Sequence, residues 1–272
     1  MRRMSWFNTT SLAFGFAFLY IPMIVVIVYS FNDNRLVTVW SGFSTRWYGE
    51  LLRNQAFLDA AWVTAKVGFF SSIAATILGT MGAYVLVRGG RFYGRTLFSG
   101  MMYAPLVMPE VITGLSLLLL FIAVNLDRGI LTIVLAHATF SMCYVSVVVS
   151  SRLVSFDRSV EEAALDLGAT PFEAFRLVTL PIIAPAVISG WLLALTLSLD
   201  DLVIASFVAG PSATTLPIKV FSSIRLGVSP EINALSTILI SIVAIGTITA
   251  SLMTKRAVVR RQKAERMAEQ SV

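Results

Sequence analysis

The chain has 272 residues, of which 57% are hydrophobic and only 13% are charged, and its mean hydropathy is +0.81. Because a soluble domain carries about 25% charged residues, this composition excludes a soluble globular protein and predicts an all-α integral membrane protein. The net charge of +6 does not indicate nucleic-acid binding, because the basic residues flank apolar runs instead of forming one soluble face. They are expected to set the orientation of the chain and to contact membrane lipid.

The first apolar run covers residues 10–31 and predicts a membrane-spanning helix. It is about 20 residues long and lacks a small-residue cleavage site, so we expect it to be retained instead of being removed as a signal peptide. Residues 32–59 are polar, and three aromatic residues stand there among arginines and acids: Trp40, Trp47 and Tyr48. This composition is typical of a segment that lies along the membrane surface.

Five further apolar runs predict membrane spans at residues 60–87, 97–124, 130–151, 182–208 and 232–253. The stretch from Arg88 to Arg95 is rich in glycine, but it lacks the Gly-Lys-Ser/Thr of a phosphate loop and is predicted to be a basic turn. A basic tail, residues 254–272, closes the chain. The sequence therefore predicts six transmembrane helices in a single domain that covers residues 1–272.

Lysine and arginine are distributed unequally between the two sides of the predicted membrane. With six spans both termini share one side, and that side carries about 14 basic residues, against about six in the opposite loops. Arg2, Arg3 and the basic residues from Lys255 to Arg266 are among the 14. The positive-inside rule then predicts that both termini and residues 152–181 are cytoplasmic.

No residues show the spacing of a metal site or of a convergent catalytic set. His137 is the one histidine and is predicted to be a structural residue with satisfied hydrogen bonds. Cys143 is the one cysteine, which excludes an internal disulfide, and its apolar surroundings predict a small buried side chain. We therefore expect a non-catalytic protein without a metal or cofactor of its own.

Residues 159–181 form a polar island between the fourth and fifth predicted spans. Two capping boxes there predict two short helices: Ser159 with Glu162, and Thr170 with Glu173. Gly168 falls where the first helix should end, and the second is expected to stop at Leu180–Pro181. Four apolar residues share one face of the first helix: Val160, Ala163, Ala164 and Leu167. A helix of about two turns needs packing against a larger partner to be stable.

The island also resembles the EAA loop of the permease subunits of binding-protein-dependent ABC importers. The matching residues are Glu162, Ala163, Ala164, Gly168, Leu180 and Pro181, with Val178 in place of the usual isoleucine. The resemblance implies the MetI-like fold of type I importers, in a bacterial inner membrane, with this loop forming coupling helices that dock on an ATP-binding subunit. No phosphate loop occurs in the chain, so ATP would be bound by that separate subunit.

Three carboxylates lie within predicted spans: Glu110, Asp200 and Asp201. Each costs roughly 2.5–3.5 kcal/mol at a span centre, and Lys66 is the one obvious cation available to pair with them there. The unpaired negative charge predicts a path for a cationic solute. Glu110 also suits the first turn of a half-helix after Pro109, since a carboxylate there is favoured by the helix dipole. Asp200 and Asp201 point about 100° apart unless the helix is broken, so one of them could instead bond a neighbouring helix.

The stretch from Pro105 to Gly114 resembles the stretch from Pro181 to Gly190, with two prolines four residues apart at the start of each. If the third and fifth spans begin alike, Glu110 lies near the cytoplasmic side, and residues 97–104 form an interfacial lead-in. If they do not, about 14 residues of helix place Glu110 near the midplane. The sequence leaves both depths open.

Several stretches are similar to the polyamine permeases, and most to those that import putrescine: LYIP at Tyr20, TRWY at Trp47, SLDDLVIASF at Asp200, GPSATTLP at residues 210–217, and SPEINAL at Glu231. The resemblance implies a heterodimer with a second permease, a pair of ATP-binding subunits and a periplasmic polyamine-binding protein. A permease for another solute, such as an amino acid, sulfate or iron, is the main alternative. An ion-coupled carrier or a membrane-embedded enzyme is more distant, since neither an extended inverted repeat nor a catalytic set is found.

Overall fold

The computed structural model describes residues 5–36, 39–227 and 229–270, with side chains described up to residue 249 and at Leu252. Arg2, Arg3 and the basic side chains of the predicted tail lie outside what is described. The described residues are almost entirely helical, with one isolated β-bridge between Asn32 and Phe43. They form two compact units, residues 1–55 with 223–272, and residues 56–222, and each is described here by itself.

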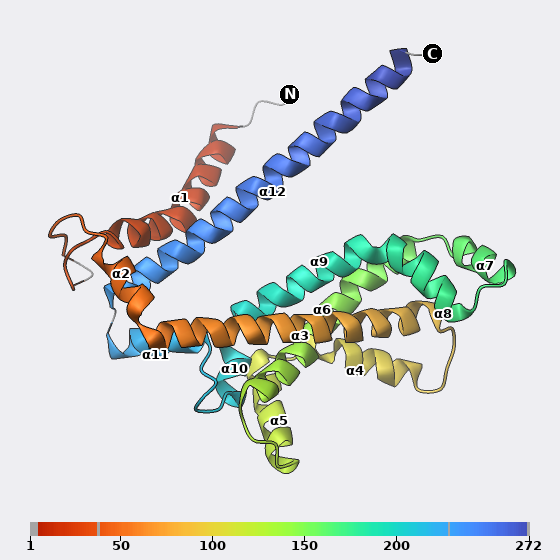
Figure 1. Cartoon of the computed structure of the whole chain (residues 1–272), viewed down its shortest axis with the longest axis horizontal. Coiled ribbons are helices and arrows are strands. Elements are labelled where there is room, and N and C mark those ends of the chain that lie inside the picture. Colours follow the sequence, from red (N-terminus) through yellow and green to blue (C-terminus); the bar gives the residue numbers. More distant parts are fainter. Residues whose placement is uncertain (1–4, 37–38, 228, 271–272) are drawn as a thin grey trace. The chain divides into compact units, whose positions relative to one another are not determined.

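The unit of residues 56–222 contains most of α3 and the nine elements that follow it along the chain (Figure 1). They are α3 (Gln55–Arg88), α4 (Arg95–Val107), α5 (Glu110–Ala123), α6 (Ile130–Ser155), α7 (Ser159–Asp166), α8 (Pro171–Ala174), the π-helix η1 (Phe175–Thr179), α9 (Leu180–Leu199), α10 (Val203–Val208) and the first part of α11 (Leu216–Leu226).

Small residues let three of these helices approach closely. On α6, Val145 lies between Gly79 of α3 and Gly190 of α9: a Cβ added to Gly79 would lie 2.8 Å from the Val145 Cβ, and one added to Gly190 would lie 3.1 Å from its Cγ1. The surrounding cluster is apolar and buried: Ala75, Ala83, Val145, Val149, Leu153, Ile183 and Ala194. Close backbone approach through glycine is typical of helix packing in membranes, where van der Waals contact replaces the hydrophobic driving force.

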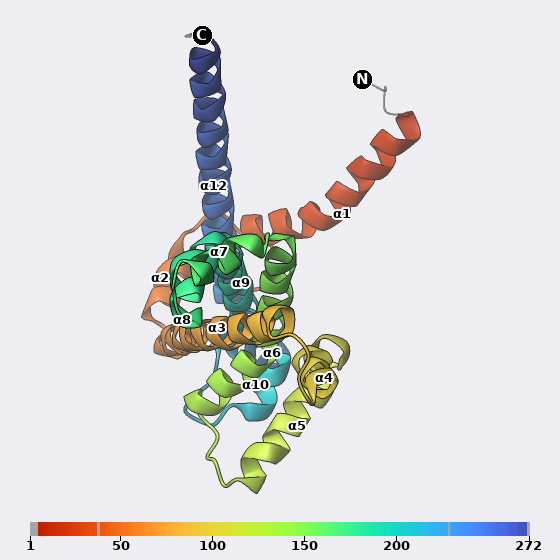
Figure 2. The same cartoon turned by 90° about the vertical axis from the view of Figure 1, so that its right-hand side faces the viewer.

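The third predicted span, residues 97–124, is two helices instead of one. α4 and α5 meet at an angle of 119° across Met108 and Pro109 (Figure 2). Pro109 has no N–H to continue α4, and it holds Met108 in an extended conformation (φ −76°, ψ 137°), so the first helix ends there. The local resemblance between the third and fifth spans does not extend to their structure, because α9 runs unbroken through Pro185.

The fifth predicted span, residues 182–208, also differs. The helix begins earlier, at Pro171, and ends at Leu199, and a separate short helix, α10, follows. The break falls at residues 200–202, where the two adjacent aspartates lie. α10 packs against α5, and a Cβ added to Gly114 of α5 would lie 2.8 Å from the Phe207 ring.

The other unit contains α1 (Trp6–Tyr29), α2 (Arg46–Arg53) and α12 (Pro230–Gln270). Asn32 is buried and organises the loop after α1: its amide donates to the carbonyl of Val39 (2.7 Å), and its own carbonyl accepts from Nε1 of Trp47 (2.7 Å). α2 buries Trp47 and Leu51 on one face, as expected for an amphipathic segment. α12 continues beyond the predicted end of the sixth span, residue 253.

Candidate coupling loop and path carboxylates

The first helix of the island, α7, begins at Ser159 as expected, but its N-terminus is capped by other hydrogen bonds than those predicted. The predicted capping box of Ser159 with Glu162 is wrong, because Arg158 is the N-cap and the N–H of Glu162 donates to the carbonyl of Arg158 (3.1 Å). Instead the backbone N–H of Ser159 donates to Oδ1 of Asp157 (3.0 Å), and Glu162 pairs with Arg158 (3.1 Å) on the exposed side. The bonds from Ser159 lower the pKa of Asp157, so its carboxylate is charged at neutral pH.

The turn between the two helices follows the prediction. Gly168 has a φ of +91°, which only glycine adopts without strain, and its N–H donates to the carbonyl of Leu165 (2.9 Å). Thr170 then caps the second helix: its Oγ1 accepts from the N–H of Glu173 (3.3 Å), and Glu173 accepts from the Thr170 N–H (2.8 Å). This capping box, with Pro171 at the first helical turn, is confirmed.

The sequence predicted that the second helix stops at Leu180–Pro181, but the chain remains helical there. It passes through one π-helical stretch, η1, and continues as α9 to Leu199. The wider π-helical ring accommodates Pro181, which has no N–H to donate to the preceding turn. The island and the fifth span are therefore one continuous helix, a more rigid connection than a turn would give.

Glu161, which the sequence analysis did not single out, is buried at the base of α7. Its Oε2 lies 2.8 Å from Nε of Arg88, the last residue of α3, and its Oε1 accepts a hydrogen bond from Oγ1 of Thr179 in η1 (2.7 Å). The two ion-paired side chains are only 12% and 10% exposed. Tyr84 of α3 also stacks edge-on against Phe175 of η1, with ring centroids 4.9 Å apart. Three elements are thus joined around one carboxylate.

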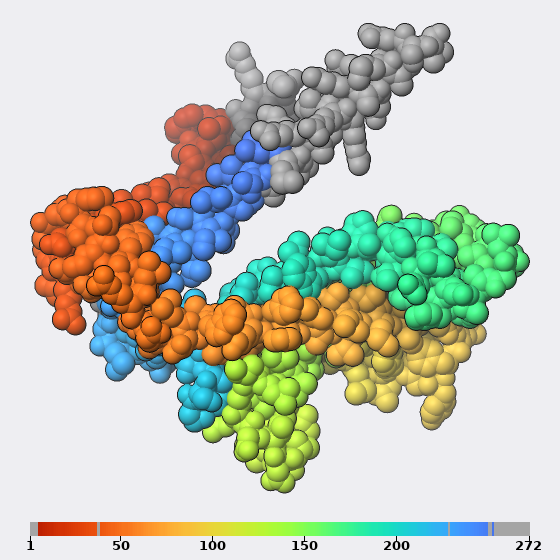
Figure 3. Space-filling view, viewed as in Figure 1, coloured from red at the N-terminus to blue at the C-terminus, as the bar shows by residue number. Residues whose placement is uncertain are grey.

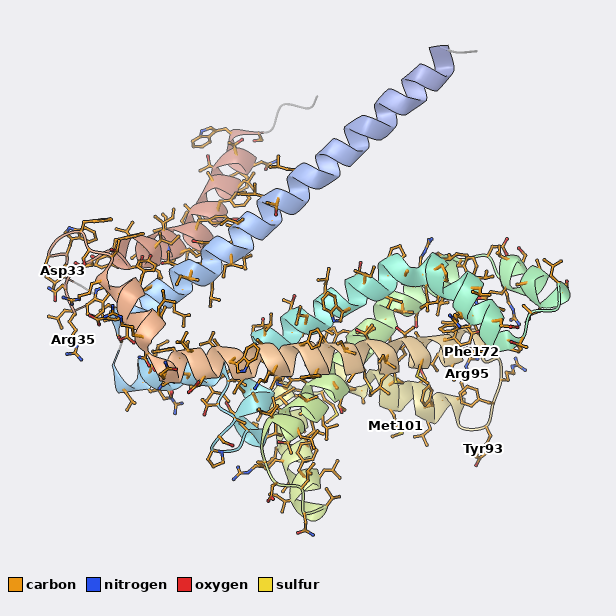
Figure 4. The ribbon with its side chains drawn as sticks, in the orientation of Figure 1. Asp33, Arg35, Tyr93, Arg95, Met101 and Phe172 are labelled. Carbon is orange, nitrogen blue, oxygen red and sulfur yellow. The ribbon has the colours of Figure 1, made fainter. Side chains whose placement is uncertain are left out.

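The outward side of the island carries the residues of the matched motif. Glu162, Ala163, Gly168 and Pro181 are exposed, and Ala164 and Leu180 are half-buried. Large apolar residues are also exposed there, among them Leu167 at 90% and Phe172 at 70%. Figure 4 labels Phe172. In the space-filling view, α7 and its turn project from one end of residues 56–222 (Figure 3). The apolar face of α7 that needs a packing partner is not covered by the described residues of this chain.

The three carboxylates predicted to line a path occupy two helix breaks. Glu110 is the first residue of α5, directly after the break at Pro109, and its side chain is exposed. Asp200 follows the last residue of α9 and is exposed as well. Neither side chain forms an ion pair with another described residue, and the described ion pairs do not include Lys66, whose Nζ lies over the Trp62 ring (5.1 Å).

Asp201 differs from its neighbour because its carboxylate is engaged inside the protein. Oδ1 accepts from the N–H of Ile204 (3.2 Å) and Oδ2 from the N–H of Ala205 (2.7 Å), so Asp201 satisfies the first free N–H groups of α10. Nε2 of His137 lies 3.0 Å from Oδ2, close but poorly aligned for a hydrogen bond. Of the two adjacent aspartates, Asp201 is therefore the one that bonds another helix, α10, which follows the break. The partners of His137 come from distant parts of the sequence, so no local pattern could have revealed them.

The loop between α10 and α11, residues 209–215, is held against the unit by close backbone contact. A Cβ on Gly210 would overlap the carbonyl of Arg128, so no larger residue fits there. At the ends of the loop, Thr132 donates to the carbonyl of Val208 (2.8 Å), and the N–H of Leu216 donates to Oγ1 of Thr64 (2.7 Å). These contacts hold the loop in one shape.

Long apolar helices, with a protruding helical loop continuous with one of them, are the features expected of the membrane subunit of a transporter. The chain belongs to the family of binding-protein-dependent transport system inner membrane components, whose sequence profile matches residues 75–263. It is a multi-pass inner-membrane protein, as the family and its apolar helices require.

Two curated relatives from Escherichia coli strain K12 cover most of the chain. The chain is 61% identical to the putrescine transport system permease protein PotI over 240 residues, 86% of this chain and 85% of the relative. It is 42% identical to the spermidine/putrescine transport system permease protein PotC, over 88% of this chain and 90% of the relative. Both relatives are transport permeases.

Solved structures confirm the expected type I ABC importer fold. A bacterial ABC transporter that imports the acidic polysaccharide alginate matches with a TM-score of 0.70 at 18% identity, covering 91% of this chain and 94% of that one. The inward-facing MetNI methionine transporter matches with a TM-score of 0.60 at 18% identity, covering 74% and 95%. At these identities the likeness concerns the fold alone.

Proposed function

We propose that this chain is the membrane-spanning subunit of a polyamine importer whose substrate is putrescine. The observation that carries the proposal is the 61% identity to PotI over most of both chains. The charge of the path supports it independently, because the exposed carboxylates at the helix breaks suit a cation and repel an anion. Putrescine carries two ammonium groups.

Glu110 and Asp200 are the residues that meet the moving cation in this proposal. Their exposure within one chain is expected if that surface lines a wet path completed by a second permease subunit. Carboxylates facing water inside a bundle avoid the cost of burial in hydrocarbon and act as counter-ions for ammonium groups. Asp201 does not contact the cation in this proposal, because its oxygens already accept two backbone hydrogen bonds.

ATP hydrolysis in a separate subunit drives the movement through the coupling loop. The exposed motif residues Glu162, Ala163 and Gly168, with Leu167 beside them, form the docking face on the ATP-binding subunit. Leu180 and Pro181 belong to the unbroken helix that carries the displacement into α9. The chain itself binds no ATP in this scheme and performs no catalysis.

The complete transporter in this proposal contains this chain, a second related permease, two ATP-binding subunits and a periplasmic polyamine-binding protein. The coupling loop and both termini face the cytoplasm, following the distribution of basic residues. The fixed outer loop near Gly210 then faces the periplasm and the binding protein. Accessibility of single cysteines placed at residues 93 and 212 to a membrane-impermeant reagent, in intact cells and in inverted vesicles, tests this orientation.

The decisive experiment is transport by the reconstituted complex. The complex should accumulate labelled putrescine in liposomes when ATP and the loaded binding protein are supplied on their respective sides. Spermidine, an amino acid and sulfate serve as competing solutes. Accumulation of another solute without putrescine would refute the substrate, and purification of the chain from native membranes without an ATP-binding subunit would refute the assembly.

A further inference from the structure

A chain of buried polar side chains ends at the break between α9 and α10. Oγ of Ser71 on α3 donates to Oγ of Ser198 on α9 (2.9 Å), and that oxygen lies 2.7 Å from Nδ1 of His137 on α6. Nε2 of the same ring lies 3.0 Å from Oδ2 of Asp201. Three helices therefore contribute to one line of contacts that terminates at an aspartate.

This arrangement fixes the orientation of the His137 ring. The side chain is 2% exposed, and the Asp201 side chain is 10% exposed. The Ser198 oxygen lies on the Nδ1 side of the ring and the Asp201 carboxylate on its Nε2 side, so the two contacts together fix the plane of the imidazole. The Nε2 contact places the ring edge beside a carboxylate that already accepts two backbone hydrogen bonds.

Asp201 in turn determines where the two exposed carboxylates lie. Its hydrogen bonds from the N–H groups of Ile204 and Ala205 hold the start of α10, and Asp200 is the preceding residue in the same break. α10 packs on α5 at Gly114, one turn after Glu110 begins α5. A shift of the α10 start would therefore move Asp200 directly and Glu110 through α5.

We propose that His137 is a positioning residue for the cation path: through Asp201 it fixes the α9–α10 break and thereby the placement of Asp200 and Glu110. The inference rests on the proposed function of these carboxylates as the path. It assigns to the single histidine a role in transport and not only in packing.

The test compares two amides that replace different ring nitrogens. Glutamine extends a donor to roughly the position of Nε2, whereas asparagine reaches roughly the position of Nδ1, so H137Q can keep the contact with Asp201 and H137N can keep only that with Ser198. We expect H137Q to retain putrescine uptake within about threefold and H137N to lose about tenfold or more, the size expected for losing a contact to a charged group. Assembly with the ATP-binding subunits should persist, and ATP hydrolysed per putrescine should rise in H137N.

A double-mutant comparison checks the route through Asp201. Uptake by H137N/D201A should be no lower than by D201A alone, because D201A already removes the same contact. Independent losses, or equal uptake by H137N and H137Q, would overturn the inference. If the histidine variants do not accumulate in the membrane, S198A replaces them, since it frees the ring to turn; a wild-type ratio of ATP to putrescine in S198A would overturn it equally. Absence of uptake by the wild-type complex would refute the proposed function instead.

Discussion

Nε of Arg88 and Oε2 of Glu161 lie 2.8 Å apart and join the end of α3 to the base of the coupling helix α7. The Arg88 guanidinium also donates to the carbonyl of Phe156 (3.3 Å), at the end of α6. The ion pair therefore connects the ends of α3 and α6 with the coupling helix. The exposed carboxylate next to it, Glu162, pairs only with Arg158 one turn earlier. Adjacent acids therefore have different roles, one internal and one facing outward.

Removal of the buried acid should destabilise the permease. E161A leaves Arg88 as an uncompensated charge, and we expect the free energy of unfolding to fall by about 3 kcal/mol. E161Q should lose less, because an amide oxygen can still accept from Thr179. Thermal unfolding of the purified subunit in detergent measures the difference.

Glu162 provides the matched control. Its ion pair is exposed, so E162Q should change stability by no more than about 0.5 kcal/mol. Charge reversal in E162K should nevertheless raise the ATP hydrolysed per putrescine imported, because it alters the docking face without altering the fold. Normal coupling in E162K, or equal stability losses at both positions, would contradict these separate roles.

Glycine should be required at position 168 because of the backbone conformation there, and not because a side chain would clash with neighbouring atoms. No atom lies within 4 Å of a Cβ built at this position, but the φ of +91° is strained for any other residue. We expect G168V to cost about 1–2 kcal/mol and to uncouple ATP hydrolysis from uptake, with G168N less affected because asparagine tolerates left-handed conformations. A G100V variant is the control, since Gly100 also has open space around it but no positive φ. Equal effects at the two glycines would exclude a conformational cause.

Substitution of the three carboxylates proposed for the path should have different effects at the exposed residues, Glu110 and Asp200, and at the half-buried Asp201. D200N and E110Q remove charge from open positions, so we expect uptake to fall about tenfold with unchanged stability. D201N replaces one of the two oxygens that accept backbone hydrogen bonds and should also lower the thermal stability of the subunit. Uptake of labelled putrescine at equal expression measures the first effect. D127N, in an exposed loop, is the control, and wild-type uptake in both D200N and E110Q would remove the proposed path.

Asp157 should contribute to the start of α7 across the physiological pH range. Its pKa is lowered by the bonds from Ser159, so the stabilisation is complete above the ordinary aspartate pKa and is lost only as the pH falls through the lowered value. D157N, which can still accept from the Ser159 N–H, should preserve amide protection in residues 159–166, whereas D157A should reduce it at pH 7. Hydrogen exchange of that segment distinguishes them, and a loss in wild type between pH 8 and pH 6 would contradict the assignment.

The sequence predicted the membrane class, the apolar runs and the turn at Gly168, because each depends on composition or on residues close together in the chain. It did not predict the continuation through Pro181, since the wider ring that tolerates proline is formed by backbone geometry and not by a residue type. The capping of α7 was assigned to Ser159 when the better acceptor, Asp157, lies two residues earlier. The partners of Glu161 and His137 are separated from them by tens of residues, so only the tertiary structure could reveal them.

The five residues of η1 change the register of the helix that connects the loop to the span. An α-helix turns by about 100° per residue, and a π-helical ring contains one residue more than an α-helical ring. If these five residues adopted α-helical geometry instead, the extra residue would no longer be absorbed, and α8 would rotate by about 100° about the axis of α9. The docking face would then point away from its partner although every motif residue was still present. The backbone geometry of this segment, and not only residue identity, is what aligns the two ends of the helix.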